Sequence, residues 1–523
     1  MLWERRPAAI RAGDGAPTIS GQKLTNSATG MSPEITVLTC VALPLLAPAL
    51  ITALHRRPNP REAITLLTSA SLFLLVTTLL DDVLKGDRPA INLVEPLPGL
   101  KIGFEVEPLG MLFALLASFL WVVTSVYSIG YMRSHHERRQ TSYYSYFAVA
   151  LGSVMGIAFA GNLFTLFIFY ELLTLSTYPL VTHAGNNAAR EGGRMYLGYL
   201  LGTSVVLLLL ALVWTWSLTG TLDFRADGIL EGVVTPTTAS ILLVLFIFGI
   251  GKAAVMPFHL WLPAAMVAPT PVSALLHAVA VVKAGVFTVL KVAIYIFGID
   301  FLATVPATQW LMYVAAATIL LAALVALRQD NLKLRLAWST ISHLSYVVLG
   351  VLLATPLGIV GGGMHIVMHA FAKITLFFCA GAIIVATHKT HISEMDGLGR
   401  RMPVTMAAFF IASLSIIGLP PLGGFWSKWY LALGTLEAQQ QVMLGVLLVG
   451  SLLNIAYLLP IPMRAFFCRE PEDPGNIGVK EAPLACVAAL VLTATACVIL
   501  FFAPGPVYNL MEAVINPSLR GTP

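Results

Sequence analysis

Charged residues are scarce in this chain of 523 residues. Asp, Glu, Lys and Arg together make up 11% of it, whereas 57% of its residues are hydrophobic. Soluble domains carry about 25% charged residues, so this composition excludes an ordinary soluble domain. The formal net charge of +5 is small. Basic residues that lie in the loops of a membrane protein indicate its orientation, and we do not expect a nucleic-acid-binding surface.

Cysteine is also rare, and no two cysteines are spaced as Cys-x-x-Cys. The five of them lie in or beside apolar segments: Cys40, Cys379, Cys468, Cys486 and Cys497. Cysteines of this kind are expected to behave as small, unpaired hydrophobic residues. A glycine run at 361–363 follows no strand pattern, so it does not predict a nucleotide-binding loop. We therefore expect no metal, no cofactor and no redox or hydrolytic site within this chain.

Apolar segments of roughly twenty residues follow one another along the chain, each long enough to cross a bilayer as a helix. The sequence thus predicts an all-α polytopic membrane protein with about fourteen transmembrane helices. They are expected near residues 35–54, 63–80, 108–132, 145–160, 163–183, 195–218, 238–256, 271–296, 308–327, 335–353, 358–387, 404–433, 440–466 and 484–503. A short polar stretch around Asn92 to Glu107 contains Pro96 and Pro98, and it is expected to form a small hairpin.

The predicted spans divide the chain into five parts. Residues 1–30 are polar, lack the apolar core of a signal peptide, and are interpreted as a disordered tail or a mis-assigned start before Met31. Residues 31–144 are expected to hold transmembrane helices one to three. Two five-helix units are predicted at 145–296 and 297–466, followed by a C-terminal helix and tail at 467–523. Arginines and lysines concentrate in alternate loops, which predicts both termini on the outer face of a bacterial inner membrane.

One stretch, Phe246–Phe287, combines an apolar sequence with two lysines, two histidines and four prolines. A lysine in hydrocarbon costs roughly 2.5–3.5 kcal/mol on insertion scales, so such residues usually line a hydrated interior. Proline and glycine break helices, and broken helices are tolerated in a membrane only where they face protein or a cavity. A second lysine beside a break occurs at Gly418–Lys428, five spans later. Because an odd offset turns the second unit upside down, we predict an inverted repeat whose matching breaks mark an ion pathway.

Five motifs in a fixed order carry a family resemblance. They are Tyr170-Glu171 followed by two leucines, Phe258–His277 with its continuation Val282–Phe287, Leu336–Tyr346, His365–Phe377 and Gly418–Lys428. The chain resembles, on these motifs, the antiporter-like subunits of respiratory complex I and of Mrp-type cation/proton antiporters. Its Ala-Pro-Thr-Pro-Val-Ser run, the lysine in Val-Lys-Ala-Gly and the lysine at position 428 are most similar to the Mrp large subunits and the distal complex I subunit.

The resemblance implies that Glu171 and Lys252 pair, and that Lys252 releases its proton when the pair separates. The alternative is a static buried salt bridge that fixes helix packing. His277 and Lys283 lie six positions apart on one span, which on a regular helix places them about 120° from each other. A water molecule could link both to a common channel. A hydrogen-bonded core histidine is the alternative interpretation of His277.

The residues His365, His369 and Lys373 recur at steps of four, so all three fall within a stripe of about 80° on one helix. Such a stripe is suited to pass protons, because each group can both accept and donate. A zinc site is the alternative for His-x-x-x-His, but no acidic residue or cysteine lies nearby in sequence to complete the metal shell. His343 is a candidate bridge between the two halves, and His259 is a weaker candidate at the first break.

The last candidate, Lys428, follows a Pro-Pro and Gly-Gly break, so backbone groups freed there can hold water beside it. The resemblance makes it the terminal proton site, opening to the outer face. A lysine that snorkels to the membrane interface is the alternative. Together these residues predict a lateral path that runs through Glu171, Lys252, Lys283, Lys373 and Lys428.

Two functions follow from this interpretation. The predicted one is a proton-translocating subunit of an Mrp-type cation/proton antiporter complex. The alternative is a proton-pumping membrane subunit of a complex I-like NADH:quinone oxidoreductase or a membrane hydrogenase. In either case the expected partners are other membrane subunits, membrane lipid and protons, with sodium or potassium as further candidates, and no nucleic acid is expected.

Overall fold

Prolines and asparagines begin many of the long helices. In the computed structural model, which describes residues 30–468 and 478–516, proline stands at the start of six long helices. The fixed φ of proline suits the first helical position, where its missing N–H needs no partner. These helices are α1 (Pro33–Ala53), α2 (Pro58–Thr78), α4 (Pro108–Ser134), α9 (Pro236–Gly249), α16 (Pro356–Thr387) and α18 (Pro403–Ile417). Asn162 and Asn331 cap α6 (Leu163–Val181) and α15 (Leu332–Leu352) by accepting a backbone N–H through their side chains.

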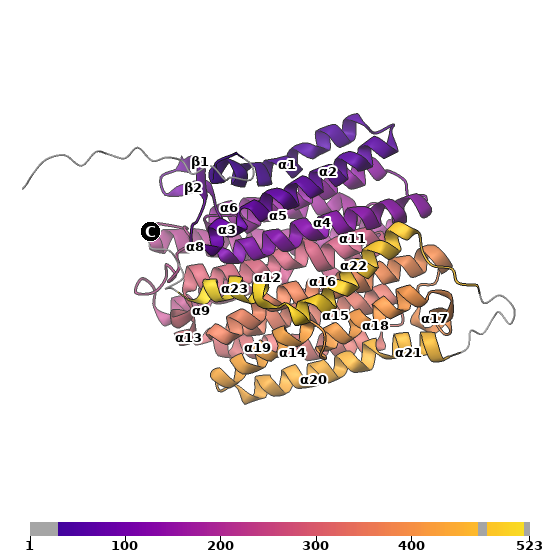
Figure 1. Cartoon of the computed structure of the whole chain (residues 1–523). Helices are drawn as coiled ribbons and strands as arrows, with labels where there is room; N and C mark the ends of the chain where they lie inside the picture. The colour runs from indigo at the N-terminus through magenta and orange to yellow at the C-terminus, as the bar shows by residue number, and fades with distance from the viewer. Residues whose placement is uncertain (1–29, 469–477, 517–523) are drawn as a thin grey trace, which may run out of the picture.

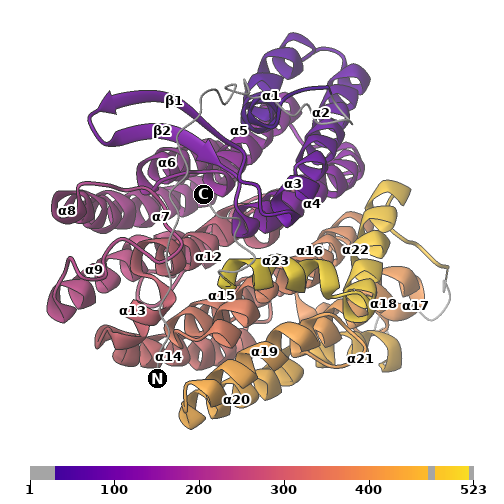
Figure 2. The same ribbon diagram turned by 60° about the vertical axis from the view of Figure 1, so that its left-hand side comes forward.

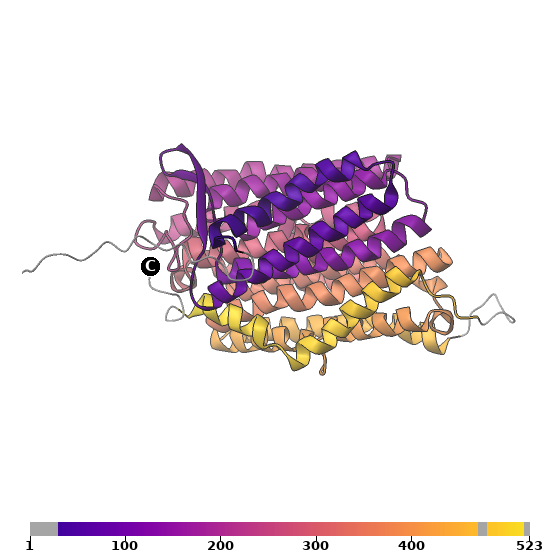
Figure 3. The same cartoon turned by 45° about the horizontal axis from the view of Figure 1, so that its top comes forward.

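The helices run side by side as one bundle (Figure 1), and the same alignment is visible when the molecule is tilted (Figure 3). Among the described residues, ten helical segments are long and apolar enough to cross a membrane, and Pro236–Gly249 and Pro403–Ile417 are shorter apolar helices. The ten are Pro33–Ala53, Pro58–Leu84, Pro108–Ser134, Leu163–Val181, Asn187–Thr219, Thr270–Phe297, Ala307–Arg328, Pro356–Thr387, Gln441–Phe467 and Leu484–Phe502. A helical multi-pass membrane protein is therefore confirmed. The count of about fourteen spans, the inverted repeat and the domain boundaries stay predictions, and the interpretation of residues 1–30 lies almost wholly outside the described residues.

A β-hairpin joins the second span to the third. After the short helix α3 (Leu80–Leu84), strand β1 (Ala90–Leu97) pairs antiparallel with β2 (Leu100–Glu105), with Ala90 opposite Glu105 and Leu97 opposite Leu100. Gly99 takes a φ of +82° in the turn between them, a conformation that glycine adopts without strain. The hairpin expected from the sequence is thus confirmed. It packs against α1 and α6 at one end of the bundle (Figure 2).

The middle of the chain contains several irregular helices. Helices α7 (Asn187–Thr203) and α8 (Leu209–Thr219) are joined through a π-helical turn, η1 (Ser204–Leu208). Helix α9 is followed by three short pieces, η2 (Gly251–Ala253), α10 (Trp261–Ala264) and η3 (Ala265–Val267). The next span is divided into α11 (Thr270–Ala274), the π-helical η4 (Leu275–Val279), α12 (Val281–Val292) and the π-helical η5 (Ala293–Phe297). Helices α13 (Ile299–Thr304) and α14 (Ala307–Arg328) complete this part.

The C-terminal helices return to the N-terminal part of the bundle. After α16 the chain forms η6 (Ile392–Glu394), α17 (Leu398–Arg401), α18, α19 (Gly424–Glu437), α20 (Gln441–Leu458) and α21 (Pro460–Phe467). The last two helices, α22 (Leu484–Phe502) and α23 (Gly505–Ile515), pack against both α4 and α16 (Figure 2). These two helices therefore cover α4 and α16 on this side of the bundle.

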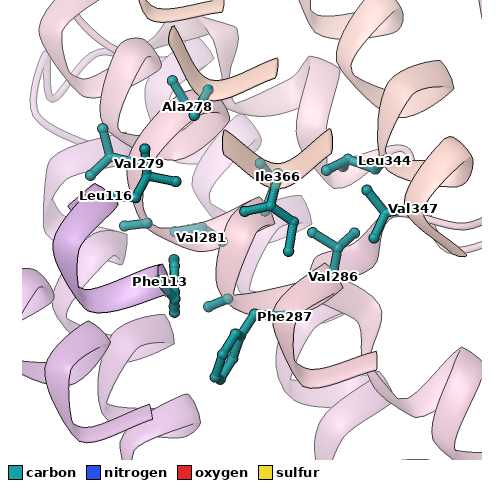
Figure 4. Packing of buried hydrophobic residues seen from close by; sticks show 14 of the residues in the cluster. Phe113, Leu116, Ala278, Val279, Val281, Val286, Phe287, Leu344, Val347 and Ile366 are labelled. Carbon is teal, nitrogen blue, oxygen red and sulfur yellow. The ribbon is translucent and has the colours of Figure 1, made fainter. Parts of the chain in front are cut away.

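The core of the molecule surrounds α12. In the span Thr270–Phe297 the most apolar window is 100% buried, against 33% for Gln441–Phe467. Phe287 of α12 stacks on Phe113 of α4, with ring centroids 4.7 Å apart. Figure 4 shows how Val286 of α12 lies near Val347 of α15 and Ile366 of α16. Polar groups on this span therefore face protein and not lipid.

Candidate functional site

The first break in the bundle holds Lys252. Helix α9 ends at Gly249, and Lys252 lies in η2, two residues before Ala254, which has a φ of +53°. The fully buried Lys252 ammonium donates to the Tyr170 carbonyl at 2.8 Å and to Thr174 Oγ1 at 2.6 Å, both on α6. It also lies 3.2 Å from the centre of the Tyr170 ring. Neutral acceptors and an aromatic face thus surround this lysine.

The ion pair between Glu171 and Lys252 that the resemblance implied is not formed. Both carboxylate oxygens of Glu171 are buried without a hydrogen-bond partner among the described residues. Successive side chains on a helix point about 100° apart, and Lys252 binds the turn from Tyr170 to Thr174. The glutamate is therefore a neighbour of the lysine site and not a direct partner of Lys252.

The central lysine, Lys283, contacts the second half of the protein. Its ammonium lies 2.6 Å from Nδ1 of His369 on α16. Glycine at position 285 lets α12 approach the first break closely, since a Cβ there would lie 2.3 Å from the Lys252 carbonyl carbon. Helix α12 thus touches the Lys252 segment on one side and binds the histidine helix on the other.

The expected 120° relation between His277 and Lys283 assumed a regular helix, and the helix between them is not regular. His277 lies in the π-helical turn η4, and Ala280 then departs from helical geometry with φ −109° and ψ −76°. Both ring nitrogens of His277 are buried without a partner in the described part of the chain. Its ring packs against Phe377, with centroids 4.7 Å apart. The structure therefore leaves the relay and core interpretations of His277 both open.

Three histidines stack on one another between α15 and α16. The His343 ring lies 5.3 Å from the His365 ring and 5.1 Å from the His369 ring, measured between centroids. His343 Nδ1 is 3.1 Å from His365 Nε2, and His365 Nδ1 is 2.9 Å from Ser427 Oγ on α19. Stacked imidazoles with direct nitrogen contacts can exchange protons over short distances.

Two other predicted residues lie apart from this histidine stack. Lys373 is on the same helix, but its ammonium donates to the Leu336 carbonyl of α15 at 3.1 Å. The stripe predicted on α16 is therefore divided: its two histidines join the stack and its lysine binds a backbone carbonyl. His259 is partly exposed beyond the first break, and its ring lies against Trp338 with centroids 5.3 Å apart.

The second break holds Lys428. Helix α18 ends at Ile417, Gly418 takes a φ of +90°, and α19 begins at Gly424. The Lys428 ammonium donates to the Ile417 carbonyl, which the break has freed, and to Ser451 Oγ on α20, both at 2.9 Å. The Tyr346 ring centre lies 5.2 Å away. The break thus supplies a backbone acceptor for the lysine, as its sequence suggested.

Sequence reasoning missed Asn454, which connects the histidines to Lys428. When the amide oxygen faces both groups, it lies 3.0 Å from His343 Nε2 and 3.2 Å from Lys428 Nζ. The amide nitrogen then donates to the Tyr457 hydroxyl at 2.6 Å and to the Gly450 carbonyl at 3.3 Å. Asn454 is fully buried on α20. An asparagine within an apolar span was the available signal, because a buried amide needs partners.

A buried ion pair between Lys291 and Glu107 was also missed. Lys291 Nζ lies 3.1 Å from Glu107 Oε1, and the two side chains are 0% and 5% exposed. Lys291 follows Lys283 by eight residues on the same apolar span, so its position in the membrane was visible in the sequence. Its partner was not, because Glu107 is 184 positions away in the chain.

Lysines thus lie at both broken helices and on the buried helix α12, and Lys283 and Lys428 contact the histidine stack directly and through Asn454, respectively. Ionisable residues of this kind within an apolar bundle are typical of membrane proteins that transport ions. The comparison with known proteins identifies its relatives. The chain belongs to the NADH:quinone oxidoreductase/Mrp antiporter transmembrane family, which matches residues 160–454. It is an antiporter-like, proton-translocating membrane subunit of the kind found in Mrp and complex I-like assemblies.

Curated relatives come from several kinds of complex. The chain is 33% identical to NADH-quinone oxidoreductase subunit N of Desulforudis audaxviator, over 73% of this chain and 76% of that one. It is 31% identical to Hydrogenase-4 component B of Escherichia coli, over 76% of this chain and 62% of that protein. It is also 31% identical to a component of a probable K(+)/H(+) antiporter of Rhizobium meliloti, over 81% of this chain and 43% of that protein. The chain thus spans less than two thirds of the latter two relatives.

Solved structures show the same fold. A chain of the Mrp complex from Dietzia sp. DQ12-45-1b superposes with a TM-score of 0.83 at 22% identity, covering 93% of this chain and 98% of that one. A chain of the membrane-bound sulfane sulfur reductase, an archaeal respiratory membrane complex, gives a TM-score of 0.82 at 23% identity over 93% and 99%. Both are multisubunit membrane complexes.

Proposed function

We propose that this chain moves protons along a lateral path through its buried lysines and histidines. The observation that carries the proposal is the contact series from Lys283 through His369, His343 and Asn454 to Lys428. It links α12 to α16, α15, α20 and α19 with nitrogen and oxygen atoms at most 3.2 Å apart, except at the His343–His369 stack. Groups coupled in this way titrate as a chain, because a charge on one changes the proton affinity of the next.

The first break serves as the input switch of this path. In the described conformation Lys252 binds the Tyr170 carbonyl and Thr174, while the Glu171 carboxylate has no partner. A buried carboxylate without a partner is unfavourable, so a competing conformation in which Lys252 binds Glu171 is expected to lie close in free energy. Movement of Lys252 between these acceptors changes its proton affinity. Protons then enter near Lys252 and Lys283 from the cytoplasm and leave near Lys428 on the outer face, with both termini on that face.

The path places Lys373 beside the main series. Its ammonium binds Leu336 at the start of α15, and its helix also carries His365 and His369. Lys373 and His277 are assigned to a side branch that supplies protons to the central histidines. This branch keeps both residues in the proton path and leaves Asn454 as the link to Lys428.

An Mrp-type cation/proton antiporter complex is the proposed parent assembly. The proposal rests on the Ala-Pro-Thr-Pro-Val-Ser run and on the lysines at positions 283 and 428, which resemble the Mrp large subunits. The second candidate is a redox-driven complex, favoured by the relative named NADH-quinone oxidoreductase subunit N. Other membrane subunits are the expected partners in both cases, and sodium or potassium is the expected counter-ion in the first.

A pull-down of the tagged chain from native membranes, with the partners identified by mass spectrometry, separates the two assemblies. Small membrane proteins without cofactors support the antiporter complex. Flavin or iron–sulfur subunits support the redox complex and overturn the first choice. In either assembly, a Lys428→Ala variant is expected to abolish proton movement in membrane vesicles, and intact transport in that variant contradicts the proposed exit.

A further inference from the structure

The Lys291 ammonium contacts three oxygen acceptors. Besides Glu107 Oε1 at 3.1 Å, it donates to the Ala160 carbonyl at 2.8 Å and reaches the Ala158 carbonyl at 3.4 Å. The centre of the Phe224 ring lies 4.8 Å away. These contacts tie the end of α12 to the turn between α5 (Gln140–Ala158) and α6.

The carboxylate of Glu107 is also fully engaged. It accepts the backbone N–H of Leu109 at 2.7 Å and of Gly110 at 2.9 Å, so it caps the start of α4. The Tyr295 hydroxyl donates to its Oε2 at 2.7 Å. Glu107 therefore holds the start of α4, the Lys291 ammonium and a tyrosine of η5 together. Farther out, Glu105 pairs with Arg88 at 3.6 Å at the partly exposed end of the hairpin.

Helix α12 has the form of a short rod between two irregular turns. Its twelve residues, Val281–Val292, are regular, whereas η4 precedes them and η5 follows them as π-helical turns. Lys283 lies near the start of the rod and Lys291 near its end, about 12 Å apart along the helix axis. π-Helical turns within α-helices occur frequently at functional sites.

We propose that Lys291 is a positioning residue, which anchors the α12 rod to Glu107 so that Lys283 stays within hydrogen-bond distance of His369. The inference rests on the proton path proposed above. Because the rod is regular, a shift at its anchored end is transmitted along its length to Lys283. The 2.6 Å contact between Lys283 and His369 is sensitive to such a shift.

Substitution of Lys291 by arginine distinguishes an anchoring role of Lys291 from a proton-carrying role. Arginine keeps the positive charge and can bind both Glu107 and the backbone carbonyls, but it holds its proton at all working pH values. A Lys291→Arg variant therefore retains an anchor and removes a carrier. A Lys291→Met variant removes both, and it leaves Glu107 with its α4 and Tyr295 contacts.

The experiment measures proton movement in vesicles that contain the assembled parent complex, for wild type and for the Lys291→Met and Lys291→Arg variants. Hydrogen exchange of the α12 amides is measured on the same purified complexes. We expect Lys291→Met to slow transport on the order of tenfold to a hundredfold, to change its pH profile, and to speed α12 exchange. Lys291→Arg is expected to restore all three. Lys101→Met removes a partly exposed pair with Asp223, 3.7 Å long, and serves as the matched control.

Three outcomes overturn the inference: wild-type transport and exchange in an assembled Lys291→Met complex, slow transport in Lys291→Arg with normal α12 exchange, or equal effects of the Lys101 control. If the Lys291→Met complex does not assemble, the anchor is tested by α12 hydrogen exchange in two other variants. These are Lys291→Arg and Glu107→Asp, whose carboxylate is drawn back by one methylene. A wild-type complex that moves no protons refutes the proposed function instead, and the exchange measurements still test the anchor.

Discussion

The two broken helices hold their lysines with the same set of groups. Lys252 binds one backbone carbonyl, one hydroxyl and one tyrosine ring, and Lys428 does the same with Ile417, Ser451 and Tyr346. The surroundings differ. An unpartnered carboxylate, Glu171, adjoins the first lysine, whereas the amide of Asn454 and the histidine stack adjoin the second. The same way of holding an ammonium thus occurs beside two different sets of neighbouring groups.

The backbone carbonyls that bind the two lysines come from different places in the fold. At the second break the acceptor comes from the interrupted helix itself, since Ile417 is the last residue of α18. At the first break it comes from α6, a different helix. A lysine bound to its own broken helix moves with that helix, whereas a lysine bound across an interface responds to the separation of two helices. The first site therefore depends on the spacing between α6 and the Lys252 segment.

The largest expected effect comes from Lys252→Arg and Lys428→Arg, made separately. Arginine keeps the charge at each break but does not release its proton, so both variants are expected to reduce transport to the rate of vesicles that lack the chain. Proton uptake into vesicles, with assembly checked on native gels, is the measurement. Loss in only one of the two variants would show that only one break carries protons.

The next effect concerns Asn454, which links Lys428 at the second site to His343. Asn454→Leu keeps the side-chain volume but removes the oxygen shared by His343 and Lys428. Transport is expected to fall about a hundredfold, because loss of the amide oxygen that positions His343 and Lys428 misplaces these two groups. Vesicle transport by the assembled variant provides the test. An unchanged rate would mean that protons reach Lys428 without passing Asn454.

A smaller effect is expected from removing the hydroxyl group that each lysine binds, on Thr174 for Lys252 and on Ser451 for Lys428. Thr174→Val removes the 2.6 Å contact of Lys252, and a hydrogen bond to a charged group is worth about 1.5–3 kcal/mol. Ser451→Ala removes the 2.9 Å contact of Lys428, but the Asn454 oxygen at 3.2 Å can compensate. Thermal unfolding of the two purified variants is therefore expected to show the larger loss for Thr174→Val. The reverse order would contradict the proposed role of Asn454.

The smallest effect lies outside the membrane, in the segment between α16 and α18. The Arg464 guanidinium donates two hydrogen bonds to Asp396, at 2.7 and 2.9 Å, and it lowers the pKa of that carboxyl below its usual value. A lowered folded-state pKa means that the stabilisation is complete at neutral pH and is lost as the pH falls through the folded pKa. For this partly exposed pair it amounts to less than about 1 kcal/mol. The protection of the α17 amides, corrected for the pH dependence of intrinsic exchange, should fall at acid pH in the wild type, and Asp396→Asn should show the lower protection already at neutral pH.

The sequence allowed much of the fold and part of the site to be predicted. Apolar length predicted a helical multi-pass membrane protein, and the cost of burying Lys252, Lys283 and Lys428 marked them as functional candidates, because these properties depend on local composition. The Asn454 link and the Glu107–Lys291 pair depend on which helices become neighbours, and no local pattern records that. The relation of His277 to Lys283 could not be predicted from the sequence for a different reason. It holds only on a regular helix, and η4 adds a wider turn between the two residues.

That wider turn has a consequence for how the chain tolerates insertions and deletions. In η4 the N–H of Ala280 donates to the carbonyl of Leu275, five residues earlier, at 2.9 Å. Deleting one residue there would convert the turn to an ordinary α-helical one, with little loss of backbone hydrogen bonding. The wide turn and an α-helical turn cover nearly the same angle, so the residues that follow would keep their orientation. A single-codon deletion in η4 is therefore expected to leave Lys283 directed at His369, whereas a deletion between Lys283 and Lys291, in regular α12, would rotate Lys291 by about 100° away from Glu107.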